Sequence, residues 1–419
     1  MAYDSYLFYL NCIDTNKKDI YIEHCKYGEL FPKTSIYNHK NKNGKKIKIG
    51  YVSPDFRNHI VMFFSYAMLA NYDKTKFEVY CYFNGVADHI TDKVKILVDR
   101  WHNVGGCSVD DVATLIKNDG IDILVDLAGH TGGNLLPVFA KKPAPIQISG
   151  IGYFNTTGLN NIDYYLSDYY CDPLGKNKDF FTEKVLRMPS SHFCYSIIKD
   201  MPIVKEKDTD KIVFGSFNNF SKINDEILCC WLEIINKVEN SKIVIKNALL
   251  CSPSEKIKFQ TRLRQLGYGE KQFELREASI DYLDEYNEIN IALDTYPYLG
   301  GGTTCEALYM GVPVITLVGD RHGARFGYSI LKNIGLDCCI AFSKKEYIEK
   351  AVELASNIGK LKYLNKNLRS IMDKSPLMNA ENYMRELEKL YELITMKYFN
   401  NKKYNLNIND YKKKLSIAV

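Results

Sequence analysis

The chain has 419 residues, of which 46% are hydrophobic and 25% charged, so two domains with sizeable cores are expected. A net charge of +5 is too small to indicate a nucleic-acid-binding surface, and no apolar run is long enough to cross a bilayer. The twelve cysteines are scattered without a Cys-x-x-Cys pair, which is typical of core thiols in a reducing compartment. We therefore expect a cytoplasmic protein without nucleic-acid partners or a membrane span.

The first part of the chain, residues 1–45, carries two helical patches and ends in a basic polar stretch. This pattern predicts a helical lead-in rather than a domain. Residues 46–204 then alternate between strands and helices, which predicts an N-terminal doubly wound, Rossmann-like domain. Its predicted strands are 46–53, 78–83, 121–129, 143–153 and 163–168, and 110–120 reads as an amphipathic helix.

A polar stretch at 205–211 is interpreted as a linker, after which the alternation restarts. Residues 205–395 are predicted to form a second Rossmann-like domain, and 396–419 a basic polar tail. The predicted strands are 213–219, 242–247, 273–278, 289–295 and 312–319, with helices at 222–238, 254–267, 281–288, 340–357 and 381–394. Two such α/β domains leave a cleft between their facing carboxyl edges, where a ligand is expected.

The most informative stretch follows the apolar run 289–295. Three glycines (Gly300, Gly301, Gly302) precede two threonines (Thr303, Thr304) and a predicted helix. Glycines allow a backbone to approach a ligand, and the free N–H groups of a helix start favour an anion. Glu306, placed on the first helical turn, is suited to accept hydrogen bonds from ribose hydroxyls. The unit predicts a nucleotide diphosphate site, although an ordinary tight turn is the alternative.

Other predicted strand ends also carry polar residues. Asp55 and His59 follow the first strand, and His130 with Thr131 follow the apolar strand at 121–129. Either histidine has a suitable intrinsic pKa for a general base, or is an ordinary loop residue. In the second domain, Asn218, Asn219 and Lys222 follow a strand. A lysine at a helix start opposes the helix dipole, and a bound anion would explain it.

At this point the chain resembles a known family. The stretches that carry the resemblance run in family order from about residue 46 to 355: GYVSPDFRNH, IDILVDLAGHT, KPAPIQISGIGYFNTTG, FGSFNNFSKI and DTYPYLGGGTTCEALYMGVP. They are similar to the catalytic region of protein O-GlcNAc transferases, and more closely to the SPINDLY branch, whose plant members transfer fucose (glycosyltransferase family 41). The resemblance implies a glycosyltransferase B fold, with two Rossmann-like domains facing a cleft, and an inverting, metal-independent transfer.

The resemblance also implies roles for single residues. His59 matches the active-site histidine, Lys222 the lysine on the donor phosphates, Gly302 and Thr303 the diphosphate loop, and Glu306 the ribose carboxylate. His130 stays a rival for the general base. The remaining expectations are a donor site that includes Asn218, Asn219, Tyr282, Gly300, Gly301 and Thr304, and an acceptor and sugar pocket with Asp55, Thr131, Tyr153, Thr156 and Thr157.

Three departures from the family pattern concern the substrates. Only a short helical lead-in replaces an extended array of helical repeats. Gly301 stands where O-GlcNAc transferases have histidine and SPINDLY-like members have a small residue. Tyr282 stands where both branches have histidine. The sole Asp-x-Asp, Asp208 to Asp210, lies in the predicted linker, so neither a metal-bound donor nor a cofactor is expected.

Three functions stay open from the sequence. The favoured one is transfer of GlcNAc from UDP-GlcNAc to Ser or Thr of a protein, with GDP-fucose as the alternative donor and a partner protein as one route of acceptor delivery. A nucleotide-sugar epimerase on the same fold would need carboxylates at the sugar ring, where mainly histidines are found. The third is an inactive nucleotide-sugar-binding module.

Overall fold

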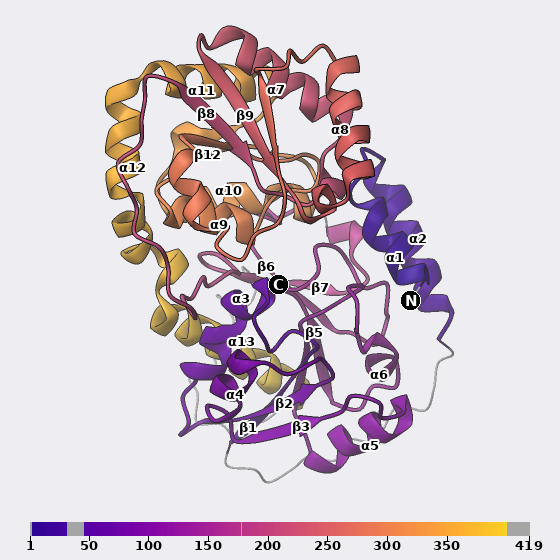
Figure 1. The fold of residues 1–419 in the computed structure, drawn as a ribbon. Coiled ribbons are helices and arrows are strands. Elements are labelled where there is room, and N and C mark those ends of the chain that lie inside the picture. The colour runs from indigo at the N-terminus through magenta and orange to yellow at the C-terminus, as the bar shows by residue number, and fades with distance from the viewer. Residues whose placement is uncertain (1, 32–45, 177, 400–419) are drawn as a thin grey trace. The chain divides into compact units, whose positions relative to one another are not determined.

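The computed structural model describes residues 2–31, 46–176 and 178–399, and its contacts divide into two compact units (Figure 1). In the described chain, the N-terminal unit comprises residues 2–10, 15–198 and 379–399. The C-terminal unit comprises 11–14 and 199–378. Each unit is built on one parallel sheet.

The sheet of the N-terminal unit has seven strands in the order β3-β2-β1-β4-β5-β6-β7. All neighbours are parallel, as expected for strands made of near-continuous apolar runs that helices cover on both faces. The strands are β1 (Ile47–Ser53), β2 (Phe77–Phe83), β3 (Arg100–Asn103), β4 (Ile123–Asp126), β5 (Ile146–Ser149), β6 (Tyr164–Asp168) and β7 (Lys184–Met188). The helices are α1 (Ala2–Leu10), α2 (Lys17–Glu29), α3 (Ile60–Ala70), α4 (His89–Lys95), α5 (Val109–Asp119), α6 (Leu136–Ala140), α13 (Ala380–Phe399) and the 3-10 turn η1 (Lys178–Phe180).

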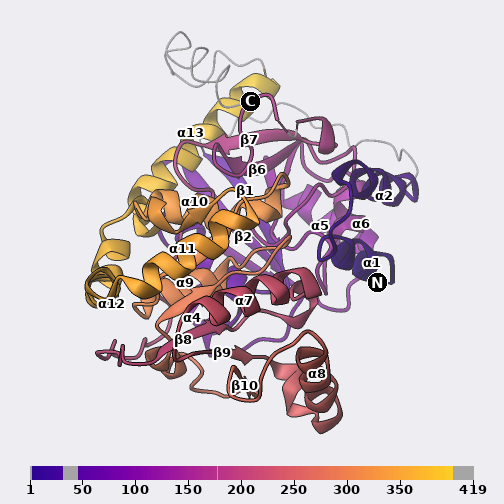
Figure 2. The same cartoon turned by 90° about the horizontal axis from the view of Figure 1, so that it is seen from above.

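The sheet of the C-terminal unit has six parallel strands in the order β10-β9-β8-β11-β12-β13. Chain order reverses between β8 and β11, which creates a topological switch point at the carboxyl edge. The strands are β8 (Ile212–Ser216), β9 (Ser241–Lys246), β10 (Phe273–Arg276), β11 (Ile291–Leu293), β12 (Val314–Leu317) and β13 (Ile340–Ala341). The α-helices are α7 (Asp225–Lys237), α8 (Pro253–Gln265), α9 (Gly302–Tyr309), α10 (Phe326–Asn333), α11 (Lys344–Ser356) and α12 (Ile358–Asp373) (Figure 2). The 3-10 turns are η2 (Phe220–Lys222), η3 (Ala248–Cys251), η4 (Asp284–Glu288), η5 (His322–Arg325), η6 (Asp337–Cys339) and η7 (Pro376–Met378).

The prediction that residues 205–395 form one domain is wrong at its C-terminal end. Helix α13 packs against α3 and the first sheet (Figure 1). The hydroxyl of Tyr391 lies 3.3 Å from that of Tyr51 in β1, and the hydroxyl of Tyr383 donates to the His192 carbonyl at 3.0 Å. These buried aromatic side chains place α13 in the N-terminal unit. Sequence spacing could not reveal this return of the chain.

The lead-in helices are part of the N-terminal unit and not an appendage. Leu7 of α1 and Tyr27 of α2 belong to the same buried cluster as Ile116 of α5 and Val138 of α6. A Cβ on Gly28 would lie 2.0 Å from the Gly158 carbonyl oxygen, so α2 can approach this loop only through a glycine. The rest of the predicted lead-in, 32–45, and the tail from 400 lie outside the described residues.

The predicted linker at 205–211 is anchored to the C-terminal unit. The amide of Lys205 donates to the Asn287 side chain at 2.9 Å, and the side chain of Asn290 donates to the Asp208 carbonyl at 2.7 Å. Two further differences concern short elements. Strands β3 and β7 were not predicted because polar residues interrupt them, and the helix expected at 281–288 is the 3-10 turn η4.

Candidate active site

The C-terminal unit brings Lys222 onto the glycine-rich turn at its switch point. Strand β8 leads into η2, which ends at Lys222, and the neighbouring strand β11 leads into the turn before α9. The Lys222 ammonium donates to the Leu299 carbonyl at 3.0 Å and lies 3.7 Å from the centre of the Tyr298 ring. Burial lowers the pKa of Lys222 to about 8, although the nearby Asp294 carboxylate opposes this shift. The site therefore holds a poorly solvated cation directly beside Gly300.

Asp294, at the end of β11, organises the turn and was not singled out by the sequence. Its Oδ1 accepts hydrogen bonds from the amides of Thr295 and Gly300 at 2.9 and 2.8 Å, and its Oδ2 accepts one from the Thr316 hydroxyl at 2.8 Å. Burial raises its pKa to about 6, against these hydrogen bonds and the charge of Lys222. Through these hydrogen bonds the Asp294 carboxylate fixes the backbone of the turn.

The glycines of the turn have a steric role. Gly300, Gly301 and Gly302 all have negative φ, so no left-handed conformation is needed. A Cβ on Gly300 would lie 2.6 and 2.7 Å from the hydroxyl oxygens of Thr303 and Thr304. The absence of a side chain lets these two hydroxyls fold back over the turn.

The polar residues around the turn divide into two groups. The Thr303 hydroxyl donates to Asn218 Oδ1 at 2.9 Å, and both side chains belong to elements that flank the switch point. The Thr304 hydroxyl is buried and donates to the Gly300 carbonyl at 3.0 Å, so it closes the helix start instead of facing a ligand. Asn219 is exposed, and its side chain accepts the Ser221 amide at 3.0 Å as the cap of η2.

Glu306 lies one turn deeper in α9 than expected, in the second helical turn, and is 5% exposed. The Tyr282 hydroxyl donates a hydrogen bond to its carboxylate. The ammonium of Lys199 lies 3.4 Å from the same hydroxyl and 5.1 Å from the centre of the Tyr282 ring. Burial raises the pKa of Glu306 to about 7, while Tyr282 and Lys199 oppose it. Lys199 was missed, because it follows no predicted strand.

In the N-terminal unit, Asp55 and His59 lie together after β1. His59 caps α3: its Nδ1 accepts the Val61 amide at 3.4 Å and lies 3.4 Å from Asp55 Oδ2. Burial lowers the pKa of His59 and raises that of Asp55, while each partner opposes the shift of the other. Nδ1 cannot serve both partners at once: a proton on Nδ1 pairs with Asp55, gives up the hydrogen bond from the Val61 amide and leaves Nε2 as a proton acceptor.

The structure argues against His130 as a general base. The ring is fully buried, with Nε2 2.9 Å from the Thr157 carbonyl and Nδ1 3.1 Å from Asp4 Oδ1. A carbonyl and a carboxylate both accept hydrogen bonds, so both ring nitrogens act as donors. The pKa of Asp4 falls to about 2, because hydrogen bonds and positive charge, including those of His130, outweigh burial. His130 thus anchors α1 and has no free nitrogen for substrate.

Three expected acceptor-pocket residues are also buried inside the N-terminal unit. The hydroxyls of Thr156 and Thr157 donate to the Glu183 carboxylate, and the Tyr153 hydroxyl lies 2.7 Å from His24 Nε2. The expectation that they line an open pocket is therefore wrong, since their polar groups hold loops and helices together. Thr131 is half-buried and donates to the Ala128 carbonyl at 2.8 Å.

Two further buried carboxylates were missed. Asp126, at the end of β4, accepts hydrogen bonds from the amides of Ala128 and Gly129 and from Ser149, and burial raises its pKa. Within the described chain, Asp168, Cys171 and His192 place potential metal-ligand atoms within 4.8 Å of one another. His192 Nδ1 and Asp168 Oδ2 are 2.6 Å apart, which fits a hydrogen-bonded pair in the core. This group belongs to the N-terminal unit and is not part of the glycine-rich turn.

Comparisons with known proteins identify the family of the chain. The model of glycosyl transferase family 41 matches residues 23–211 and 204–387. The chain is 35% identical over 94% of its length to a probable UDP-N-acetylglucosamine–peptide N-acetylglucosaminyltransferase SPINDLY of Solanum lycopersicum, and 38% identical to its namesake in Hordeum vulgare. It spans 44% and 43% of these two relatives.

A solved structure is similar over nearly the whole chain. An O-GlcNAc transferase mutant of Thermobaculum terrenum superposes with a TM-score of 0.88 at 30% identity, covering 95% of this chain and 78% of that one. The two parallel α/β sheets are those of the glycosyltransferase B fold. Within the described residues, no helix is both long and apolar enough to cross a membrane. By its family match and by these relatives, the chain belongs to glycosyl transferase family 41.

Proposed function

We propose that the protein is an inverting, metal-independent glycosyltransferase that moves GlcNAc from UDP-GlcNAc to a Ser or Thr hydroxyl of a protein. The observation that carries this proposal is the position of Lys222, whose ammonium lies against the turn that opens α9. A cation and free amides at one point stabilise a leaving diphosphate without a metal ion. The names of the SPINDLY relatives support the donor and the acceptor.

The donor occupies the carboxyl edge of the second sheet in this proposal. The diphosphate lies on the turn Gly300–Thr303 beside Lys222, and the ribose hydroxyls donate to Glu306. Tyr282 now holds the Glu306 carboxylate, so the incoming ribose shares or replaces this hydrogen bond. Asn218 orients Thr303 at the phosphate side. No residue of this group needs a metal ion for its role.

His59 acts as the general base in the same proposal. Asp55 keeps the proton on Nδ1, and Nε2 accepts the proton of the acceptor hydroxyl as the oxygen attacks the anomeric carbon. The diphosphate departs with its charge held by Lys222. Attack from the face opposite to the leaving group inverts the anomeric centre.

The test is a donor panel with the purified protein. UDP-GlcNAc, GDP-fucose and other nucleotide sugars are incubated with and without a Ser/Thr peptide library, and free nucleotide, free sugar, epimer and glycopeptide are measured. The proposal expects UDP release and β-linked GlcNAc on peptide from UDP-GlcNAc. Fucosylated peptide would assign GDP-fucose as the donor, an epimer would assign an epimerase, and nucleotide binding without turnover would assign a binding module.

A further inference from the structure

A second hollow in the C-terminal unit is not part of the candidate donor site. A cavity of about 390 Å³ lies between the segment 204–209 and helix α12. Its volume falls in the range of small-molecule sites. None of the turn residues 300–306 lines it, and neither does Lys222. The cavity is therefore separate from the proposed donor site.

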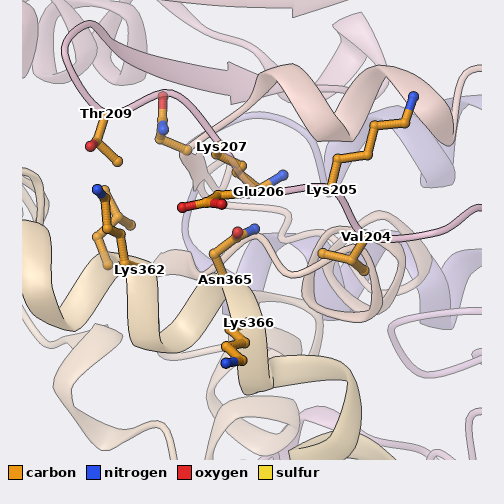
Figure 3. A pocket seen from close by; sticks show the side chains of 10 residues that line it. Val204, Lys205, Glu206, Lys207, Thr209, Lys362, Asn365 and Lys366 are labelled. Atoms are coloured by element: carbon orange, nitrogen blue, oxygen red, sulfur yellow. The ribbon is translucent and has the colours of Figure 1, made fainter.

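The polar groups of this cavity come from both of its walls (Figure 3). The side chains of Glu206 and Asn365 face each other across the hollow, and Lys362 reaches from α12 toward Thr209. Lys205 points away from the hollow. The lining contains cations, a carboxylate, amides and a hydroxyl, but no aromatic ring on which a base would stack.

Lys207 is the unusual member of the lining. Its side chain is 7% exposed, and its ammonium donates to the Tyr286 carbonyl at 2.6 Å. That bond uses one of the three ammonium donors. Burial lowers the pKa of Lys207 to about 7, and no carboxylate charge offsets this shift. A buried cation without a counter-ion is costly, and an anion in the cavity would supply one.

We propose that this cavity binds a small hydroxylated phosphate ester of the sugar-phosphate class. Lys207 and Lys362 hold the phosphate through charge-assisted hydrogen bonds. Glu206, Asn365 and Thr209 exchange hydrogen bonds with the sugar hydroxyls. A simple anion would leave the Glu206 carboxylate facing a like charge, whereas sugar hydroxyls give it donors.

The site has a direct connection to the glycine-rich turn. Lys207 donates to the Tyr286 carbonyl, and the Tyr286 hydroxyl donates to the Thr303 carbonyl at 3.4 Å. Tyr286 thus contacts both Lys207 in the cavity and Thr303 in the proposed diphosphate loop. This connection gives a phosphate ester in the cavity a physical route to the donor site.

Isothermal titration of the full chain in saturating UDP tests the proposal, because UDP blocks the donor site. The probes are glucosamine 6-phosphate, glucosamine and inorganic phosphate. We expect glucosamine 6-phosphate to bind, with the other two weaker by about tenfold or more. Lys362→Met and Lys207→Met should each weaken binding by about tenfold or more. Lys374→Met, an exposed lysine at the end of α12, should leave it unchanged.

Several outcomes would overturn the proposal. These are no binding of glucosamine 6-phosphate, equal binding of inorganic phosphate, and an unchanged affinity in the folded Lys362→Met protein. Lys362 is exposed on α12, so this variant tests the site even if Lys207→Met fails to fold. The proposed function is tested separately, by the turnover of the donor in the parent protein. The result of that assay does not depend on whether the cavity binds a sugar phosphate.

Discussion

The phenol of Tyr282 donates a hydrogen bond to the buried carboxylate of Glu306, the group proposed to receive the ribose. Burial raises the pKa of Glu306 to about 7, so the carboxylate titrates near neutral pH. The ionised form is the better acceptor for ribose hydroxyls. In the proposed mechanism, donor recognition therefore depends on one titratable side chain and on the tyrosine whose hydrogen bond favours its ionised form.

This relationship predicts a pH dependence of nucleotide binding. The affinity for UDP should rise as the pH increases through about 7, because Glu306 loses its proton. In Tyr282→Phe the carboxylate loses a hydrogen bond that favours its charged form, so the midpoint should move to higher pH. Isothermal titration calorimetry with UDP from pH 6 to 8.5 measures the pH dependence of the affinity and its midpoint in the parent and in Tyr282→Phe. Glu306→Gln is the control that removes this titration, and an unshifted midpoint in Tyr282→Phe would contradict the coupling.

Lys222 is predicted to be essential for turnover but not for folding. Lys222→Ala removes the cation beside the leaving diphosphate, which should lower kcat by about a hundredfold or more. Burial lowers the pKa of this lysine to about 8, so the folded state disfavours its charge and gains nothing from it at pH 7. The protein should stay folded, with only the small loss of stability that follows from the missing hydrogen bond to Leu299. Lys237→Ala, on the exposed side of α7, is the matched control, and near-normal kcat in Lys222→Ala would exclude the proposed role.

Turnover is predicted to survive chelation. The proposed diphosphate site relies on Lys222 and backbone amides, so EDTA should leave the initial rate unchanged. The measurement is UDP release with and without EDTA after exhaustive dialysis. If activity disappears and magnesium or manganese restores it, the metal-independent mechanism is wrong.

Gly300→Ala tests the steric role of the turn. The new methyl group would lie 2.6 and 2.7 Å from the Thr303 and Thr304 hydroxyls, so the turn must open. We expect a loss of about 1–3 kcal/mol in the free energy of unfolding and a weaker affinity for UDP. Gly269→Ala is the control, because its Cβ would meet only ordinary contacts from 3.5 Å. If a folded Gly300→Ala protein binds UDP as tightly as the parent, the diphosphate does not bind on this turn.

The two histidines are predicted to behave differently. His59→Ala should lower kcat by about a hundredfold, because it removes a general base, and should cost only the stability of the long cap bond at the start of α3. His130→Ala should lower the free energy of unfolding by about 2 kcal/mol, because Asp4 and the Thr157 carbonyl lose a buried donor. Denaturant unfolding and steady-state rates measure both effects.

The stability lost in His130→Ala should also depend on pH. The pKa of Asp4 is lowered to about 2 in the folded protein. The ionised Asp4 therefore contributes its full stabilisation of the fold above an ordinary carboxyl pKa, and this stabilisation disappears as the pH falls toward 2. The difference between parent and variant should therefore shrink in acid. A fully stable His130→Ala protein without activity would reverse the assignment of the two histidines.

The sequence by itself determined much of the second sheet and its site. Apolar runs such as 289–295 and 312–319 are long enough to specify buried parallel strands, and the glycines after 299 mark the turn between them. The family motifs also lie in these local stretches. The sheet order, in which β8 and β11 are neighbours, is what brings Lys222 beside this turn.

Only the tertiary structure decided which polar residues remain available to a ligand. His130 has the same local sequence signal as His59, but Asp4 of α1 occupies its ring from a distant part of the chain. Glu183 occupies the hydroxyl of Thr157 in the same way. The place of α13 was decided in the same way, by aromatic side chains that pack against the first sheet. Burial and hydrogen-bond partners arise from long-range packing, and periodicity along the chain reports only which face of an element is apolar.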